Sequence, residues 1–183
     1  MKALRCAGYT LAELLVVVAV LAVAAVVALP TAQPVTEFRA DAAVGEVVHA
    51  LRFARDDARH SGAQRLFDCA AATNTISVLG LKTWLLTTVT DGVINHPFSG
   101  APYRLALDAT PAGNAMALVR CTFTYTDNVT LTSVAFDAIG NPVRGVGTGL
   151  ARTEALRSGR VVLGIGNVVR NVDIDATGRI TVS

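Results

Sequence analysis

Apolar residues form one long run near the start of the chain. The run extends over 21 residues from Tyr9 to Leu29, and its only charged member is Glu13. As a helix rising about 1.5 Å per residue it would be about 31 Å long, which is enough to span the apolar core of a bilayer. Pro30 follows directly and ends the run. The pattern therefore predicts a transmembrane-length helix that carries one unexplained carboxylate.

Beyond Pro30 the apolar positions become periodic. Between residues 35 and 60 they recur at spacings of three, four and seven, which is typical of an amphipathic helix. These positions are Phe38, Val44, Val47, Val48, Leu51, Ala54 and Ala58. Arg and Asp side chains fill the opposite face, and Ser61-Gly62 is a stop signal. We expect the apolar stripe to lie on a sheet, and we interpret the charged cluster from Arg55 to Arg59 as a solvated helix face.

After Gly62 the pattern changes to short runs typical of strands, separated by turn-forming residues. The expected strands cover residues 64–69, 75–79, 84–90, 103–107, 115–125, 129–136, 160–165 and 168–175. One long helix followed by many short, antiparallel-looking strands indicates the α+β class. The glycine-rich segment 145–149 has no following Lys and no phosphate-binding context, so it is expected to be a flexible loop between strands.

Composition and charge add little to the predicted fold and function. The 183 residues suffice for one domain with an N-terminal appendage, and 52% of them are hydrophobic. The formal net charge is +2, but the segment from Arg144 to the end carries six Arg against Glu154, Asp173 and Asp175. This basic excess is too small to demand a nucleic-acid partner.

Two of the three cysteines lie in the body of the chain. If this part is exported to an oxidising compartment, Cys69 and Cys121 are able to form a disulfide, which would stabilise the fold by about 4 kcal/mol on the chain-entropy model. Two separately buried thiols are the alternative, because free Cys is among the most buried residue types. The sequence leaves both possibilities open. Cys6 precedes the apolar run, and no cysteine falls at metal-ligand spacing.

The apolar run by itself allows two ordinary interpretations. A secretory signal peptide would place a small-residue cleavage site after the run, and Ala25 to Ala28 loosely supply one. A plain single-span anchor would use the basic residues Lys2 and Arg5 on the inner side. Neither interpretation explains Glu13, because a carboxylate in hydrocarbon costs several kcal/mol unless it is paired.

The segment GYTLAELL, residues 8–15, resembles the class III signal of type IV pilins and type II secretion pseudopilins. In that family a short basic leader ends in Gly, an aromatic residue follows, and Glu occupies the fifth mature position. Counted from Tyr9, Glu13 is the fifth residue and Pro30 the 22nd, where the family usually has a proline kink. Tyr9 departs from the commoner Phe but keeps the aromatic ring.

This resemblance implies how the N-terminus is processed and used. A prepilin peptidase would cut after Gly8 and methylate the new amine of Tyr9. Glu13 of an incoming subunit would then neutralise the Tyr9 amine of its neighbour, because a desolvated charge is tolerable only when it is paired. The apolar helix would serve first as an inner-membrane anchor among lipids and then as part of a filament core.

Three further fragments resemble the GspH/FimT group of minor pseudopilins and minor pilins. They are residues 51–58 (LRFARDDA), 134–142 (VAFDAIGNP) and 170–180 (RNVDIDATGRI). The resemblance implies a pilin-like α+β fold, with the long helix packed on an antiparallel sheet. It also implies four segments: a removed leader over 1–8, an apolar helix over 9–30, an amphipathic second half over 31–62, and a β-rich periplasmic domain over 63–183.

Taken together, these features favour a non-catalytic minor pseudopilin that resembles GspH and works in a type II secretion pseudopilus. Its expected partners are other pseudopilins, the prepilin peptidase, the inner membrane and exported cargo. The alternative is a FimT/FimU-like minor pilin of a type IV pilus, in which some members bind DNA through arginines near a G-R-x-R ending. Here Arg179 is present but Thr181 replaces the second Arg, so DNA contacts through Arg170 and Arg179 are the less favoured interpretation.

Nothing in the sequence has the spacing of a catalytic, metal or cofactor site. The three histidines, His49, His60 and His96, are scattered and are expected to have surface or core roles. The serines at 61, 99 and 158 lack a G-x-S-x-G context, which argues against a hydrolase. We therefore expect no catalytic residues, no metal and no cofactor.

Overall fold

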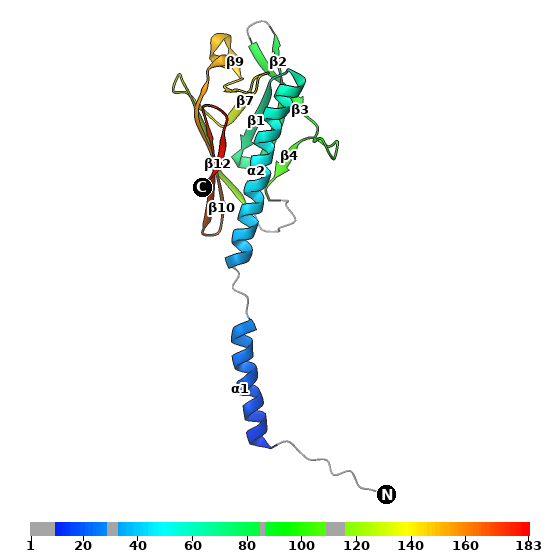
Figure 1. Cartoon of the computed structure of the whole chain (residues 1–183), viewed down its shortest axis with the longest axis vertical. Coiled ribbons are helices and arrows are strands. Elements are labelled where there is room, and N and C mark those ends of the chain that lie inside the picture. The colour runs from blue at the N-terminus through cyan, green and yellow to red at the C-terminus, as the bar shows by residue number, and fades with distance from the viewer. Residues whose placement is uncertain (1–9, 29–32, 85–86, 109–115) are drawn as a thin grey trace. The chain divides into compact units, whose positions relative to one another are not determined.

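The computed structural model describes residues 10–28, 33–84, 87–108 and 116–183. The chain divides into two compact units, Met1–Pro34 and Val35–Ser183. Figure 1 draws both units with their helices and strands labelled. Gly8, Tyr9 and Pro30, for which the sequence predicts cleavage, methylation and a helix kink, lie outside the described residues.

The first unit contains helix α1, Leu11–Ala28. Among residues 11–24, whose side chains are described, all the large apolar ones are exposed, from Leu11 at 83% to Val17 at 48%. Within the part of the chain that the structure describes, no helix has both the length and the apolar character needed to cross a membrane.

Helix α2, Gln33–Ser61, provides the first element of the second unit from Val35 onward, as the apolar periodicity predicts. Its buried positions follow each other at spacings of three and four. They are Ala40, Ala43, Val44, Val47, Ala50, Leu51, Ala54 and Ala58. The helix ends where predicted, because Gly62 adopts a positive φ of 65°, which suits the residue that follows a helix.

Phe38 does not belong to the buried stripe of α2, contrary to expectation. Its side chain is 75% exposed. Phe38 precedes Ala40 by two positions, and at about 3.6 residues per turn this places it on a different side of the helix. Val44, the next predicted position, is six residues later, which does not fit the helical repeat, and the true stripe is centred on small alanines.

Two antiparallel sheets form the rest of this unit. The first has the strand order β8-β7-β1-β2-β3-β9, with β4 also paired to β2, and the second has the order β12-β11-β10-β5-β6. The strands of the first sheet are β1 Arg65–Ala70, β2 Thr75–Trp84, β3 Thr87–Val93, β4 Arg104–Ala106, β7 Ser133–Phe136, β8 Pro142–Val143 and β9 Gly147–Thr148. Those of the second are β5 Ala117–Tyr125, β6 Thr130–Leu131, β10 Leu156–Ile165, β11 Val168–Asp175 and β12 Ile180–Val182. Two short 3-10 helices, η1 Ala71–Thr73 and η2 Gly149–Thr153, complete the elements.

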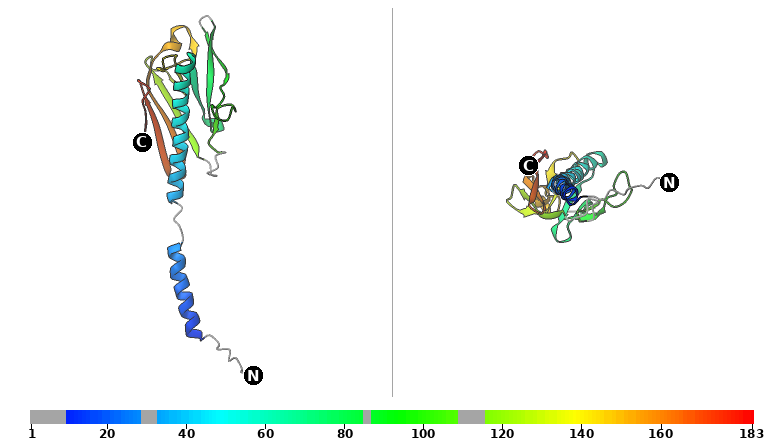
Figure 2. Two further views of the ribbon diagram at one scale, coloured as in Figure 1. Left: turned by 45° about the vertical axis from the view of Figure 1, so that its right-hand side comes forward. Right: turned by 90° about the horizontal axis from the view of Figure 1, so that it is seen from below.

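Helix α2 lies lengthwise against both sheets. Figures 1 and 2 show β10 and β12 to one side of the helix and β2, β3 and β4 to the other. Its buried alanines and valines join one core with side chains from both sheets, such as Phe67 of β1 and Phe123 of β5. These two rings meet edge to face with centroids 6.2 Å apart. The α+β class and the helix-on-sheet packing inferred from the sequence are confirmed.

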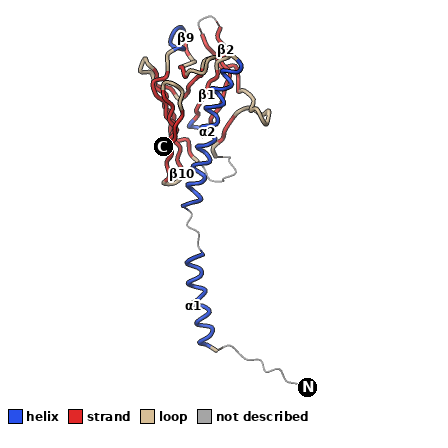
Figure 3. The backbone as a smooth tube through the Cα atoms, viewed as in Figure 1, coloured by secondary structure: helices blue, strands red, loops and turns tan. Residues whose placement is uncertain are grey.

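The strand predictions hold for the longer elements and fail for the shortest ones. Figure 3 shows how strands and loops alternate through the second unit. The expected strand 129–136 is divided into β6 and β7, because the two halves pair with different sheets. The expected flexible loop at 145–149 is partly a strand, since Gly147 and Thr148 of β9 pair with β3. A strand of two residues is too short to show an alternation of apolar and polar positions, so it is recognised only by its pairing with another strand.

A disulfide joins the two sheets. Cys69 lies in β1 and Cys121 in β5. Their Cα atoms are 6.3 Å apart, and their sulfur atoms form a disulfide bond. Both residues are buried, with exposed fractions of 4% and 5%. The bridge therefore lies inside the core, close to Phe67 and Phe123, and ties together strands that are not hydrogen-bonded to each other.

Two glycines make a matched pair for testing this packing. A Cβ on Gly159 of β10 would lie 2.4 Å from Phe123 Cδ1 and 2.5 Å from Ile174 Cγ2, whereas a Cβ on Gly45 of α2 would meet nothing within 4 Å. We expect Gly159→Ala to lower the free energy of unfolding by about 1–3 kcal/mol through overpacking. Gly45→Ala should raise it by about 0.5–1 kcal/mol, because Ala suits a helix interior better. Urea unfolding followed by circular dichroism measures both, and a harmless Gly159→Ala would contradict the packing between β10 and β5.

Candidate assembly site

The start of α1 shows how Glu13 is held. The Glu13 amide donates to the side-chain oxygen of Thr10 at 3.3 Å and to the Thr10 carbonyl at 3.1 Å. Thr10 and Glu13 thus form the T-x-x-E spacing of a capping box, in which the threonine satisfies an amide left over at the helix start. An acidic residue in the first turn also suits the positive end of the helix dipole. This capping geometry was readable from the sequence but was not recognised there.

The carboxylate of Glu13 has no partner among the residues that the structure describes. The residue is exposed, and no described side chain forms a hydrogen bond or ion pair with it. Around it, Leu14, Leu15 and Val18 are likewise exposed apolar side chains. An all-apolar surface with a single carboxylate near one end needs an environment that the described residues of this unit do not supply.

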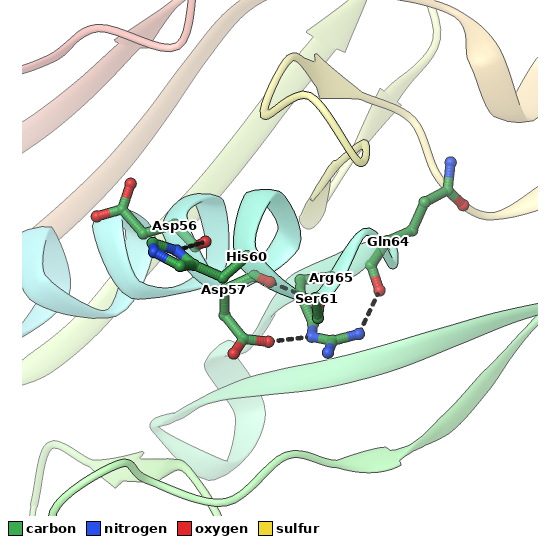
Figure 4. Close-up of polar contacts among 6 residues, drawn as sticks. All are labelled: Asp56, Asp57, His60, Ser61, Gln64 and Arg65. Atoms are coloured by element: carbon green, nitrogen blue, oxygen red, sulfur yellow. Dashed lines mark hydrogen bonds and ion pairs between the residues drawn. The ribbon is translucent and has the colours of Figure 1, made fainter.

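The C-terminal end of α2 is polar but not simply solvated. Figure 4 shows the Asp57 carboxylate paired with Arg65, the first residue of β1. Ser61 donates its hydroxyl to the Asp57 carbonyl at 2.5 Å, and His60 Nδ1 contacts the Asp56 carbonyl at 2.9 Å. Side chains of this helix end therefore fix the turn into β1, which corrects the expectation of a purely solvated face.

Two arginines one turn apart on α2 reach distant turns of the β domain. Arg55 Nη1 donates to the Gly178 carbonyl at 2.9 Å, and Nη2 to the Thr177 carbonyl at 3.5 Å. Arg59 Nε donates to the Ile139 carbonyl at 3.0 Å. The helix segment 51–58 thus contacts the segment 170–180 through Arg55, and the next residue, Arg59, contacts the segment 134–142.

The glycines of these turns leave the room that the arginines occupy. A Cβ on Gly140 would lie 2.2 Å from Arg59 Nε, and one on Gly178 would lie 3.4 Å from Arg55 Cζ. Both glycines also have positive φ, 82° and 79°, which other residues rarely adopt. Glycine is required at both positions by the backbone and, at Gly140, by the close approach of the arginine as well.

The turn that Arg55 holds is organised by Asp175. Its Oδ1 accepts hydrogen bonds from the Thr177 hydroxyl at 2.6 Å, the Thr177 amide at 2.8 Å and the Arg179 amide at 3.0 Å. The hydrogen bond from the Thr177 side chain, followed by that from the Arg179 amide, lowers the pKa of the Asp175 carboxyl. A lowered pKa means that this turn is stabilised above the ordinary Asp range and loses that contribution as the pH falls through the lowered value.

The two arginines proposed for DNA contact have different surroundings. Arg170 Nε donates to Asp41 Oδ1 of α2 at 3.0 Å. Arg179 is exposed, and its charge acts on Asp175. Most other arginines of this basic quarter also have polar partners: Arg144 pairs with Asp127, Arg160 with Asp173, and Arg157 contacts Asn128. Most of these arginines therefore already have polar or acidic partners within the domain.

Arg55→Ala should destabilise the β domain by about 1.5–3 kcal/mol, because hydrogen bonds from a charged donor to two carbonyls are lost. Arg52→Ala, an exposed arginine one turn earlier, should change the free energy of unfolding by less than about 0.5 kcal/mol. Urea unfolding compares the two variants. Equal effects would mean that Arg55 contributes only its general charge and not its contacts with the 177–178 carbonyls.

Comparison with known proteins adds one motif and one distant structural likeness. Residues 4–29 match the family model described as the prokaryotic N-terminal methylation motif. No curated protein matches the chain. The crystal structure of the type IV minor pilin FimU of Pseudomonas aeruginosa is 17% identical, covers 82% of this chain and 87% of its own, and has a TM-score of 0.38. At that identity and TM-score the likeness transfers no property of FimU to this chain.

The methylation motif covers the residues on which the resemblance to prepilins was based, from the leader through Glu13 to Leu29. Behind it follow a long helix packed on antiparallel sheets and turns held by that helix. The match covers the N-terminal motif alone, so the likeness of the rest of the chain to the GspH/FimT group rests on the sequence fragments described above.

Proposed function

We propose that this chain is a non-catalytic minor pseudopilin, similar to GspH, of a type II secretion pseudopilus. The observation that carries the proposal is the prokaryotic N-terminal methylation motif over residues 4–29. The exposed apolar surface of α1 supports it, because such a helix becomes stable only among lipids or other helices.

Processing is the first step of the proposed function. A prepilin peptidase removes residues 1–8 by cutting after Gly8 and methylates the amine of Tyr9. The mature chain remains in the inner membrane through the apolar segment 9–30, with the domain from Val35 onward on the periplasmic side. The peptidase, membrane lipid and other pilin-type subunits are the partners that this pathway requires.

Assembly follows through α1 and Glu13. The Glu13 carboxylate has no partner among the described residues, so it is available for the Tyr9 amine of a neighbouring subunit. Pairing the two charges removes the penalty of placing either one in an apolar filament core, and only the correct stagger of subunits brings them together. The proline at position 30 is proposed to kink the helix at the base of the globular domain.

Co-expression with a prepilin peptidase tests the processing step. Mass spectrometry should find a chain that begins at Tyr9 and carries one added methyl group, while the chain expressed alone should retain residues 1–8. Cleavage after the apolar run, near Ala28, would instead identify a secretory signal peptide and overturn the proposal. An uncut chain in the presence of an active peptidase would also overturn it.

A FimT/FimU-like minor pilin of a type IV pilus is the second candidate. The exposed position of Arg179 favours it, because this residue matches the first arginine of the G-R-x-R ending. Deleting the gene in its own host distinguishes the two systems. Exported enzymes retained in the periplasm would support the pseudopilus, whereas loss of surface pili or DNA uptake with normal secretion would support the pilus.

A further inference from the structure

A cluster of five aromatic rings lies between α2 and the loop from 94 to 103 that joins β3 to β4. Phe53 and Tyr103 stack with centroids 4.8 Å apart, and His96 contacts Tyr103 at 4.9 Å and Phe98 at 5.8 Å. His49 of α2 stacks on His96 at 6.4 Å and bonds the Tyr103 hydroxyl through Nδ1 at 3.0 Å. The cluster begins in the buried core at Tyr103 and ends at Phe98, which is 88% exposed.

Backbone hydrogen bonds join the two ends of this loop, and His96 forms hydrogen bonds with residues at its tip. Tyr103 donates its amide to the Ile94 carbonyl at 2.7 Å, and His96 donates to the Ala101 carbonyl at 2.7 Å. At the tip, the Gly100 amide donates to the His96 carbonyl at 2.9 Å. The Phe98 amide donates to Nδ1 of the His96 ring at 3.2 Å. One residue thus contributes its amide, its carbonyl and its side chain to the same loop.

The contact with Phe98 requires one form of the His96 ring. An imidazole nitrogen accepts a hydrogen bond only when it carries no proton, so this contact forms with the neutral ring whose proton is on Nε2. A protonated ring would point an N–H group at the Phe98 amide. Two donors would then face each other, and the Phe98 amide would lose its acceptor.

We propose that His96 is a proton-sensitive latch that holds the tip of the 94–103 loop and so sets how Phe98 is presented at the surface. Imidazole is the side chain that most readily gains or loses a proton near neutral pH, so it suits such a role. The neutral ring holds the Phe98 amide; when the ring is charged, the hydrogen bond is lost and the tip becomes mobile.

The neighbouring groups affect the latch in opposite directions. Protonated His49 would repel a charged His96 ring, whereas Glu46, one turn earlier on α2, supplies a negative charge to the cluster. Burial, together with the charge of Glu46, raises the pKa of Tyr103 to about 12, so its phenol stays neutral over the whole range. The tyrosine is therefore a partner of constant charge for His49.

Hydrogen exchange at the Phe98 amide tests the latch. It is measured by NMR on the full-length chain in detergent micelles at pH 7.5 and pH 5.0, for the wild type and His96→Asn. An Asn side-chain oxygen accepts from the amide two residues on, as in an Asx turn, but does not titrate. Comparing the two proteins at the same pH cancels the intrinsic dependence of exchange on hydroxide.

The expected result is similar exchange at pH 7.5 and about fivefold faster exchange in the wild type at pH 5.0, the equivalent of one ordinary hydrogen bond. His96→Ala, which has no acceptor, should exchange fast at both pH values. His60→Asn is the matched control, because His60 lies at the end of α2 and contacts the Asp56 carbonyl, and it should behave as the wild type. An equal ratio of wild type to His96→Asn at both pH values, or full protection in His96→Ala, would overturn the proposal.

Discussion

Replacing Glu13 by Gln should leave the chain processed and inserted but prevent its incorporation into filaments. The variant keeps the side-chain length and the amide hydrogen bonds to Thr10 that begin α1. It loses only the charge, so the Tyr9 amine of a neighbouring subunit would be left unpaired in an apolar environment. Breaking a buried ion pair on one side costs about 3–5 kcal/mol, which corresponds to a loss of about a hundredfold or more in incorporation.

The measurement is the amount of the subunit in sheared filaments relative to the membrane fraction, with the N-terminal sequence of the membrane form as proof of processing. Glu13→Ala should fail in the same way, since it also lacks the charge. Thr10→Val is the control for helix capping: it removes the side-chain acceptor but keeps Glu13 charged, and should incorporate nearly normally. Normal incorporation of Glu13→Gln would refute the charge-pairing account of this carboxylate.

The second large effect is expected from the link between the two sheets. Removing both half-cystines, as Cys69→Ala with Cys121→Ala, should lower the free energy of unfolding by about 4 kcal/mol, because a cross-link over 52 residues restricts the unfolded chain. For a domain of this size the melting temperature should fall by about 8–16 °C. Thermal unfolding without reductant, followed by circular dichroism, compares the variant with the wild type.

The state of the thiols is checked on the unprocessed chain, which contains all three cysteines. Alkylation after denaturation without reductant should label Cys6 alone, so the leader serves as an internal positive control. Labelling of all three thiols would show that the bridge does not form in the cell. In that case the double variant should lose only the packing of two small side chains, and its melting temperature should fall far less.

The sequence predicted the elements whose information is local. The three-four spacing of apolar residues located α2, and Gly62 marked its end, because both depend on side chains within a few turns of each other. The longer strands were found for the same reason. Phe38 was misassigned because it lies six positions before Val44, and at about 3.6 residues per turn that spacing puts it on another side of the helix.

Such local patterns could not predict the contacts that organise the β domain. Arg55 bonds a carbonyl 123 residues away and Arg59 one 80 residues away, and both looked like part of a solvated face. A clue was present, since two arginines four residues apart share a helix side and two glycine turns occur later in the chain. Which turns lie beside that helix depends on the order of strands in two sheets, and no local signal encodes that order.

By itself, then, the amino-acid sequence determined the N-terminal motif around Gly8, Tyr9 and Glu13, the two helical segments and the α+β class. Each of these features depends on neighbouring residues or on a short repeat of apolar positions. The tertiary structure alone decided that the strands form two sheets, that Cys69 and Cys121 face each other across them, and that His96 meets His49 and Tyr103. These are encounters between distant segments, and they exist only once the sheets have packed against the helix.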